Sequence, residues 1–238
     1  MKIKLTLVAA LLLVLGINLF GQHKYFSLGV NDNGICLGNS SKYNGLRLNI
    51  WDKDFLKING INISCISEGK KLNGISIDLL VTDIANSNGI IMSGCVIDGN
   101  SNGLAVSGCV TDGNHNGLTV SGLYTNYNKL NGMGISCFIL GDTLNGLLIG
   151  LFAGCSAFGA NAIPSGAFIN GIAVAGGQVT TGTLNGGAIS LIGNHTNTQN
   201  GVAIGLINST YYLHGFIDRM LVSSIRGFLS QKTIELLQ

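Results

Sequence analysis

Apolar and polar positions alternate along this chain within a unit that recurs every 14 or 15 residues. The marker of each unit is a glycine, usually preceded by asparagine. These glycines are Gly34, Gly45, Gly60, Gly74, Gly89, Gly103, Gly117, Gly132, Gly146, Gly171, Gly186 and Gly201, with His214-Gly215 at the next position. Counting from each glycine, positions plus one and plus three are aliphatic in nearly every unit, while position plus two varies, as Arg47, Ser76 and Ala105 do. The alternation predicts a short β-strand with plus one and plus three facing a core and plus two facing solvent.

A tight bend and a second strand complete the predicted unit. Position plus four holds a small residue in most units, such as Ser93, Ser107 and Ser121, which predicts a bend that excludes large side chains. A second apolar cluster follows six or seven residues after the glycine, and an aliphatic residue such as Leu130 or Leu144 often stands two before it. Each unit is therefore expected to be a strand, a bend, a second strand and a polar return to the next marker.

Two all-β architectures fit such units. In a β-solenoid of short coils, each Asn-Gly pair is a structural corner, because glycine adopts backbone angles closed to most residues and asparagine tolerates the neighbouring ones. The corners of the most regular units are Asn88-Gly89, Asn102-Gly103, Asn116-Gly117 and Asn131-Gly132. In an up-and-down β-barrel or an antiparallel meander, the same pairs would form type I′ turns between antiparallel strands.

Identical residues at identical phase favour the solenoid. Cys95 and Cys109 occupy equivalent positions in successive units, as do Asp98 and Asp112, and stacking in register brings like onto like. The alternation also lasts only about four residues, whereas a strand of a membrane barrel needs roughly 9 to 11. We therefore predict an all-β solenoid in which Val106 lies in the core between the equivalent residues of the two neighbouring coils.

The two ends of the chain depart from the repeat. Residues 1–21 are a predicted secretory signal peptide, with a basic head followed by an apolar run that is too short to span a membrane. Residues 22–215 are the predicted solenoid, and no transmembrane helix is expected in the mature chain. In residues 216–238, apolar positions recur at helical spacing, so a C-terminal capping helix is expected over the last coil. Within the long step from Gly146 to Gly171, Phe158-Gly159 is expected to be a degenerate marker.

Composition narrows the classes of function. Only 10% of the residues are charged and the formal net charge is +2, so nucleic acid is not expected as a partner. Six cysteines in an exported chain raise the question of disulfides, but no CxxC or zinc-type spacing occurs. Because stacked side chains point in parallel, we predict small core or bend cysteines, with Cys95 and Cys109 as the one credible bridge.

Residues that could carry chemistry are sparse. His115 and His195 lie in returns with no nucleophile placed beside them, so they are expected to be solvated turn residues. Asp83, Asp98 and Asp112 share one phase and could form a calcium ladder, although solvated turn aspartates are the default interpretation. We therefore predict no catalytic residue and no cofactor.

Two further patterns suggest surfaces. Two Thr-x-Thr pairs, at 181–183 and 196–198, are a weak match to the flat threonine arrays with which some solenoids bind ice. The two adjacent charged returns at 52–57 and 68–71 form a candidate contact patch, and solubility is the simpler explanation of their charge.

Two stretches resemble a known family. "NGVAIGLINSTYYLHG" (200–215) and "SGLYTNYNKLNG" (121–132) resemble the bacterial surface-repeat family of exported tandem-repeat proteins. The resemblance implies a repetitive β-rich protein of the cell envelope or surface, without catalytic residues.

Together these patterns predict a non-enzymatic structural or interaction module, exported to the periplasm, the outer membrane or the cell surface. The expected partner is another envelope protein or a glycan. The alternatives are a carbohydrate-binding or carbohydrate-active β-helix and an outer-membrane β-barrel.

Overall fold

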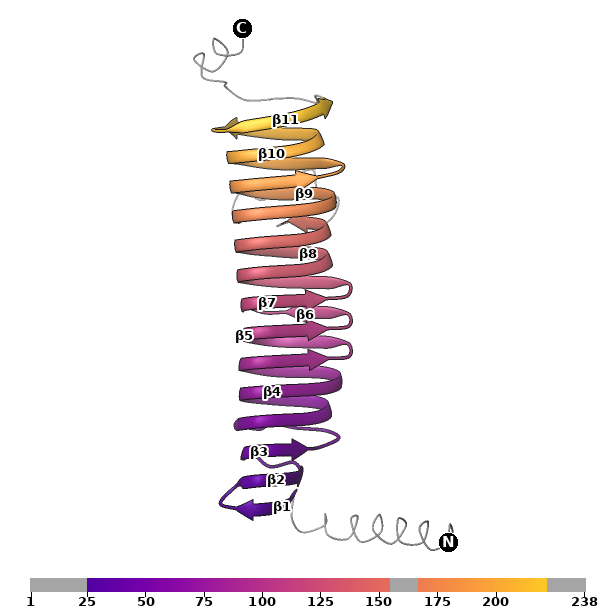
Figure 1. Cartoon of the computed structure of the whole chain (residues 1–238), viewed down its shortest axis with the longest axis vertical. Helices are drawn as coiled ribbons and strands as arrows, with labels where there is room; N and C mark the ends of the chain where they lie inside the picture. The colour runs from indigo at the N-terminus through magenta and orange to yellow at the C-terminus, as the bar shows by residue number, and fades with distance from the viewer. Residues whose placement is uncertain (1–24, 155–166, 222–238) are drawn as a thin grey trace, which may run out of the picture.

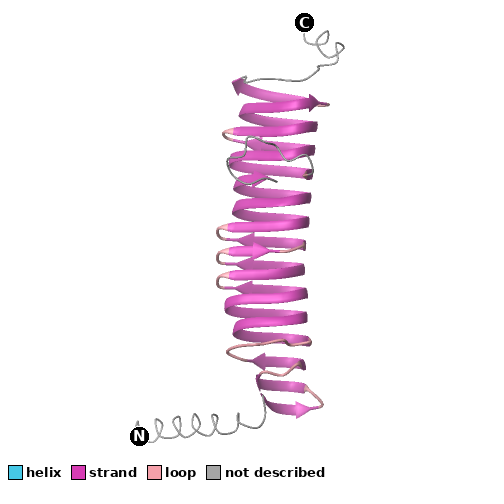
Figure 2. Cartoon of the chain, turned by 180° about the vertical axis from the view of Figure 1, so that it is seen from behind, coloured by secondary structure: helices cyan, strands magenta, loops and turns pink. Residues whose placement is uncertain are grey.

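The computed structural model describes residues 25–154 and 167–221, which form a β-solenoid of about 11 turns (Figure 1). Its strands are β1 (Tyr25–Val30), β2 (Asn33–Gly38), β3 (Lys42–Leu48), β4 (Lys57–Ser93), β5 (Val96–Ser107), β6 (Val110–Asp112), β7 (His115–Ser121), β8 (Tyr124–Gly154), β9 (Phe168–Ser190), β10 (Gly193–Leu213) and β11 (Phe216–Leu221). The longest strands run on through the corners of successive coils, so the chain winds into one continuous stack (Figure 2). The predicted solenoid is thereby confirmed.

Successive coils pair in parallel, and the marker glycine of each unit lies opposite the marker glycine of the next. Gly34 pairs with Gly45, Gly45 with Gly60, and Gly89 with Gly103, and the asparagine before each glycine pairs in the same way. The corner requires glycine for two reasons. At Gly103, φ is 128°, and an added Cβ would lie 2.2 Å from the carbonyl oxygen of Gly89 in the preceding coil. The Asn-Gly pairs are therefore corners of the solenoid and not hairpin turns.

One hairpin does occur, at the N-terminal end of the stack. Strand β1 pairs antiparallel with β2, and Tyr25 lies opposite Gly38. The connection is at Asn31 and Asp32, whose φ angles of 52° and 58° suit a type I′ turn. Because β1 occupies the outer edge of β2, it satisfies backbone groups that would otherwise form an open sheet edge.

The long step in the repeat is an insertion within one coil. Gly146 pairs directly with Gly171, and Thr143 with Phe168. No additional coil lies between these partners, so the stack does not use Phe158-Gly159 as a marker, and that pair itself lies outside the described residues.

The predicted capping helix is wrong over its first residues. Residues 216–221 form β11, which pairs in parallel with β10, with Val202 opposite Phe216 and Ile207 opposite Leu221. Gly215 also stacks on Gly201, so the coil phase continues through this point and the exposed edge of β10 gains backbone hydrogen bonds. Residues 222–238 of the predicted helix lie outside the described residues.

The side of the strand that faces inward is opposite to the prediction. Position plus two is buried, as Arg47, Ser76 and Ala105 show, whereas Ile77 and Met92 at plus three are exposed. Val106 is likewise only half-buried on the outer side. Alternation places positions minus two, plus two and plus four on one side of the strand. These three columns, together with buried residues later in the unit such as Ile97 and Thr111, fill the interior of the narrow coil, so the aliphatic columns at plus one and plus three remain outside.

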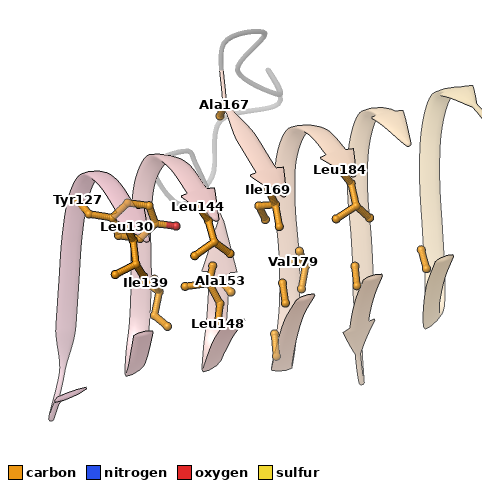
Figure 3. Close-up of a cluster of buried hydrophobic side chains, with 14 residues drawn as sticks. Tyr127, Leu130, Ile139, Leu144, Leu148, Ala153, Ala167, Ile169, Val179 and Leu184 are labelled. Atoms are coloured by element: carbon orange, nitrogen blue, oxygen red, sulfur yellow. The ribbon is translucent and has the colours of Figure 1, made fainter. Parts of the chain in front are cut away.

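The interior changes character along the stack. In the later coils the column at minus two stacks Leu130, Leu144, Ile169 and Leu184 inside successive coils (Figure 3), and buried polar residues such as Asn194 and Asn208 follow toward the C-terminal end. A second apolar cluster begins at Phe55 and extends into the middle coils. The first coils also enclose charged and polar side chains. The solenoid is therefore a filled stack whose buried charged side chains, Arg47, Asp52 and Asp78, lie in its N-terminal coils.

Candidate functional site

The outward columns at plus one and plus three form an apolar surface along the stack, which we call the aliphatic face. Its most exposed members come from β2, β4, β7, β8, β9 and β10, and each exposes 36–49% of its surface. They are Ile35, Leu37, Ile61, Ile63, Ile77, Met92, Leu118, Ile149, Ile172, Ile189, Val202 and Ile204. Parallel pairing in register aligns them in two columns. Soluble monomers rarely expose apolar patches larger than a few hundred Å², so such a face is typical of a contact surface.

An asparagine ladder borders the aliphatic face. In each pair the Nδ2 of one asparagine donates to the Oδ1 of the asparagine in the preceding coil, at 2.6–3.0 Å. The ladder comprises Asn44, Asn59, Asn73, Asn88, Asn102, Asn116, Asn131, Asn145, Asn170, Asn185 and Asn200. The predicted corner asparagines are therefore placed as expected, and their side chains are tied to one another. Each bond requires an asparagine opposite the equivalent asparagine of the preceding coil, so a shift of the strand register by one residue would break the whole series.

The predicted aspartate column lies on the second strand of the coils. Asp83 pairs with Asp98, and Asp98 with Asp112. All three side chains are exposed. Burial and the neighbouring Asp98 carboxylate raise the pKa of Asp83. The next coil replaces aspartate by Asn126, whose Nδ2 donates to Asp112 at 3.1 Å. Among the described residues, no three His, Cys, Asp or Glu side chains are grouped so as to hold a metal ion, so this column is not such a group.

His115 is not the solvated residue that was predicted. Its side chain is buried, and its Nδ1 lies 2.6 Å from the Oγ of Ser101. Burial lowers the pKa of His115 to about 4, against an opposing effect from Asp112. His115 pairs with Leu130 of the next coil, so it occupies the inward column at minus two. Burial also lowers the pKa of His195, which is half-buried.

A buried ion pair lies inside the first coils. The Nη1 of Arg47 is 2.5 Å from the Oδ2 of Asp52, and both side chains are fully buried. The guanidinium also donates to Asn62 at 3.1 Å and to Asn39 at 3.0 Å, and it lies 5.5 Å from the ring centre of Phe55. Desolvation lowers the pKa of Arg47, and the Asp52 carboxylate opposes this effect. Because the partners fix the guanidinium on several sides, the pair joins neighbouring coils.

A second buried carboxylate is surrounded by hydroxyl groups. Asp78 accepts from Ser64 at 2.7 Å, Ser67 at 2.6 Å, Ser76 at 2.9 Å and Thr82 at 2.5 Å. Burial raises the pKa of Asp78, and these four hydrogen bonds oppose the rise. The hydroxyl groups saturate the carboxylate from within the protein, so this arrangement holds coils together and does not present a carboxylate to a substrate.

Sequence reasoning missed Arg47, Asp52 and Asp78 as buried groups. The signal lies in position: Arg47 is at plus two and Asp78 at plus four, and both columns share the inward side with the aliphatic column at minus two. Asp52 was assigned to a charged return, but it is equivalent to the buried Ser67 of the next coil. Counting every second position from the aliphatic column at minus two would have identified Arg47 and Asp78 as inward residues, but not Asp52.

Two further predictions concern cysteine and threonine. The five described cysteines are free, and Cys95 and Cys109 are unbridged neighbours, with the backbone nitrogen of Cys109 donating to the Cys95 carbonyl at 3.0 Å. Thr181 and Thr196 pair in register but are buried. They therefore cannot form the exposed threonine array that ice binding would need.

Comparisons with protein-family models, with curated proteins and with solved structures found no match to this chain. Within residues 25–154 and 167–221, no helix is long and apolar enough to cross a membrane.

Proposed function

We propose that this chain is an exported, non-enzymatic structural or interaction module of the bacterial envelope or cell surface, and that the aliphatic face is its contact surface. The observation that carries the proposal is the exposure of twelve large aliphatic side chains in two aligned columns. Burying them against a partner would release water from apolar surface, which is the main favourable term in most protein association.

The distribution of ionisable groups supports a non-enzymatic role. The buried carboxylates of Asp52 and Asp78 are occupied by Arg47 and by hydroxyl groups. The imidazole of His115 is buried inside the stack. A catalytic site needs several ionisable groups that converge on a substrate, whereas Asp52 is paired with Arg47 inside the coils, and Asp78 and His115 contact hydroxyl groups there. The apolar leader at residues 1–21 and the resemblance to exported surface-repeat proteins support export.

Fractionation of bacterial cells that produce the full chain tests the location. We expect the protein in the periplasm, the outer membrane or the protease-accessible surface fraction. A chain that stays in the cytoplasm with its leader intact would contradict the proposal.

Formaldehyde cross-linking in the same cells tests the contact surface. We expect a cross-linked species of higher mass in the wild type and its loss when Ile77 and Ile149 are both replaced by lysine, because both side chains belong to the aliphatic face. A glycan-array screen provides the alternative outcome. Glycan binding that survives these two substitutions would favour a carbohydrate-binding solenoid.

A further inference from the structure

We propose that the aliphatic face binds a second copy of this chain, so that two solenoids pack face to face as a homodimer. The inference rests on the proposed role of the aliphatic face as a contact surface, and it names the occupant. It is carried by the exposed area of the face, by its repeat distance and by the absence of charged side chains among its twelve members.

The area of the face suits a stable dimer. An aliphatic residue that exposes 36–49% of its surface contributes on the order of 70 Å². The twelve members together provide about 800 Å², which is what one partner contributes to an interface of standard size. The half-buried members of the same columns, such as Ile75, Val106 and Val120, extend this area further.

The repeat distance of the face selects a partner with the same spacing. Side-chain rows on stacked parallel strands recur about every 4.8 Å. Over about 11 turns this gives a regular surface about 50 Å long. A second copy presents rows at the same spacing, so its side chains can interdigitate with every row of the first, as in other pairs of packed sheets.

The composition of the face permits contact between identical surfaces. All twelve members are aliphatic or methionine, so contact between these members of two copies brings no like charges together. One charged residue, Asp218 of β11, stands opposite Ile204 at the C-terminal end of the plus-three column. The aspartate column of Asp83, Asp98 and Asp112 lies on the second strand of the coils and not in these columns. Like charges placed opposite each other would cost energy, and this arrangement avoids them.

Two other occupants fit the face less well. Residues 222–238 lie outside the described residues, and a helix of that length would reach only about 26 Å, or half of the face. Laid across the sheet in extended form, that segment would leave its backbone groups without partners. A membrane surface usually also attracts basic residues beside the apolar ones, whereas exposed lysines beyond the asparagine ladder flank only part of the aliphatic face, at Lys42, Lys57, Lys71 and Lys129.

The test measures molar mass in solution for the wild type and for a face variant. In the variant, Met92 and Leu118 are both replaced by lysine. Both lie near the middle of the stack, so each contacts the partner whichever way the second copy is oriented. They expose 44% and 36% of their surface, so lysine can keep its charge in water and the fold should persist, which circular dichroism checks.

Light scattering coupled to size exclusion at about 10 µM protein should give twice the mass of one chain for the wild type. The face variant should give the mass of one chain, with the dissociation constant raised at least about 100-fold. The matched control replaces Ala85 and Asn128, which are exposed in the returns, by lysine. It adds the same charge away from the face and should remain a dimer.

A wild type with the mass of one chain would overturn the inference, as would a face variant that remains a dimer. Flotation of a monomeric wild type with vesicles of phosphatidylethanolamine and phosphatidylglycerol would overturn it in favour of a membrane. The two proposals fail separately. A monomer located in the envelope defeats only the dimer, and a dimer retained in the cytoplasm defeats only the proposed location.

Discussion

At the scale of single residues, stability depends on which side of the strand a position faces. Buried positions of this narrow coil hold small or aliphatic side chains, such as Ala188 and Leu184, neutral hydroxyl groups, such as that of Thr119, or charged groups with internal partners, such as Asp78. An unpaired charge at such a position carries a large desolvation cost. Adjacent positions on the outer side tolerate most residues.

The same substitution at two alanines tests this difference. Ala188 is buried in the apolar cluster of the later coils and pairs with Ala203 of the next coil, whereas Ala85 is exposed. We expect Ala188→Asp to lower the free energy of unfolding by several kcal/mol, because it buries an unpaired carboxylate. Ala85→Asp should change it by no more than about 0.5 kcal/mol. Urea unfolding followed by circular dichroism measures both, and equal losses would show that the inward side has been misassigned.

His115 makes stability depend on pH. Its pKa is lowered from 6.5 to about 4 in the folded chain, so between these values the unfolded chain binds more protons than the folded chain. The stability that the neutral imidazole provides is present above pH 6.5 and is lost as the pH falls toward 4. The loss approaches about 3 kcal/mol.

Comparison with His115→Gln isolates this effect. Glutamine keeps a polar group near Ser101 but does not titrate, so the unfolding free energy of the variant should fall less between pH 7 and pH 4.5. Parallel pH profiles for the two proteins would mean that His115 does not titrate below its usual range.

At the scale of the coil, the corner glycines and the asparagine ladder determine the register. Each ladder hydrogen bond contributes only about 0.5–1.5 kcal/mol net, but the series extends over the whole stack and all of its members depend on one register. The corners bring backbones so close that no side chain fits between them.

Two glycine substitutions separate corner from strand. At Gly103, alanine would combine a φ of 128° with a Cβ 2.2 Å from a backbone oxygen, and we expect a loss of about 2–4 kcal/mol. At Gly187 the nearest atom to an added Cβ is the Cγ1 of Ile172, at 3.8 Å. Alanine there should be neutral or should stabilise by up to about 1 kcal/mol. Thermal unfolding measures the stability of both variants. A larger loss of stability in Gly187→Ala than in Gly103→Ala would contradict the role of Gly103 as a corner that only glycine can occupy.

At the scale of the whole molecule, each coil contacts only its neighbours, so damage should spread from where it is introduced. The N-terminal coils enclose the buried pair of Arg47 and Asp52, and the later coils contain the larger cluster of buried apolar side chains. Different parts of one stack therefore depend on different forces, and they should respond differently to the same kind of change.

Arg47→Met tests this local dependence. It leaves the carboxylate of Asp52 buried without its cation, which should cost about 3–5 kcal/mol. Hydrogen exchange should show protection lost first in β3 and the start of β4, while β9 and β10 remain protected. A second variant that also carries Asp52→Leu removes the unpaired charge and should recover part of the loss. Uniform loss of protection along the chain would contradict nearest-neighbour coupling.

Sequence periodicity was sufficient to predict the solenoid, its Asn-Gly corners and the stacking of like residues, such as Asp98 on Asp112. A repeat of 14 or 15 residues brings each marker onto the previous one, and backbone hydrogen bonds between parallel strands then align every position between markers. Both steps depend only on spacing along the chain, so they can be deduced without knowing the interior.

Which side of each strand became the interior was decided only when the coil closed. Alternation separates two sides but does not say which one is buried, because both sides of the strand carry large aliphatic residues, with Leu130 and Leu184 inside and Ile77 and Ile189 outside. The antiparallel cap β1 and the continuation into β11 also depend on open strand edges, which exist only in the folded stack. Burial of Arg47, Asp52 and His115 also depends on closure of the coil. Only the closed coil brings Arg47 beside Asp52 and His115 beside Ser101, so that these polar side chains can lie inside.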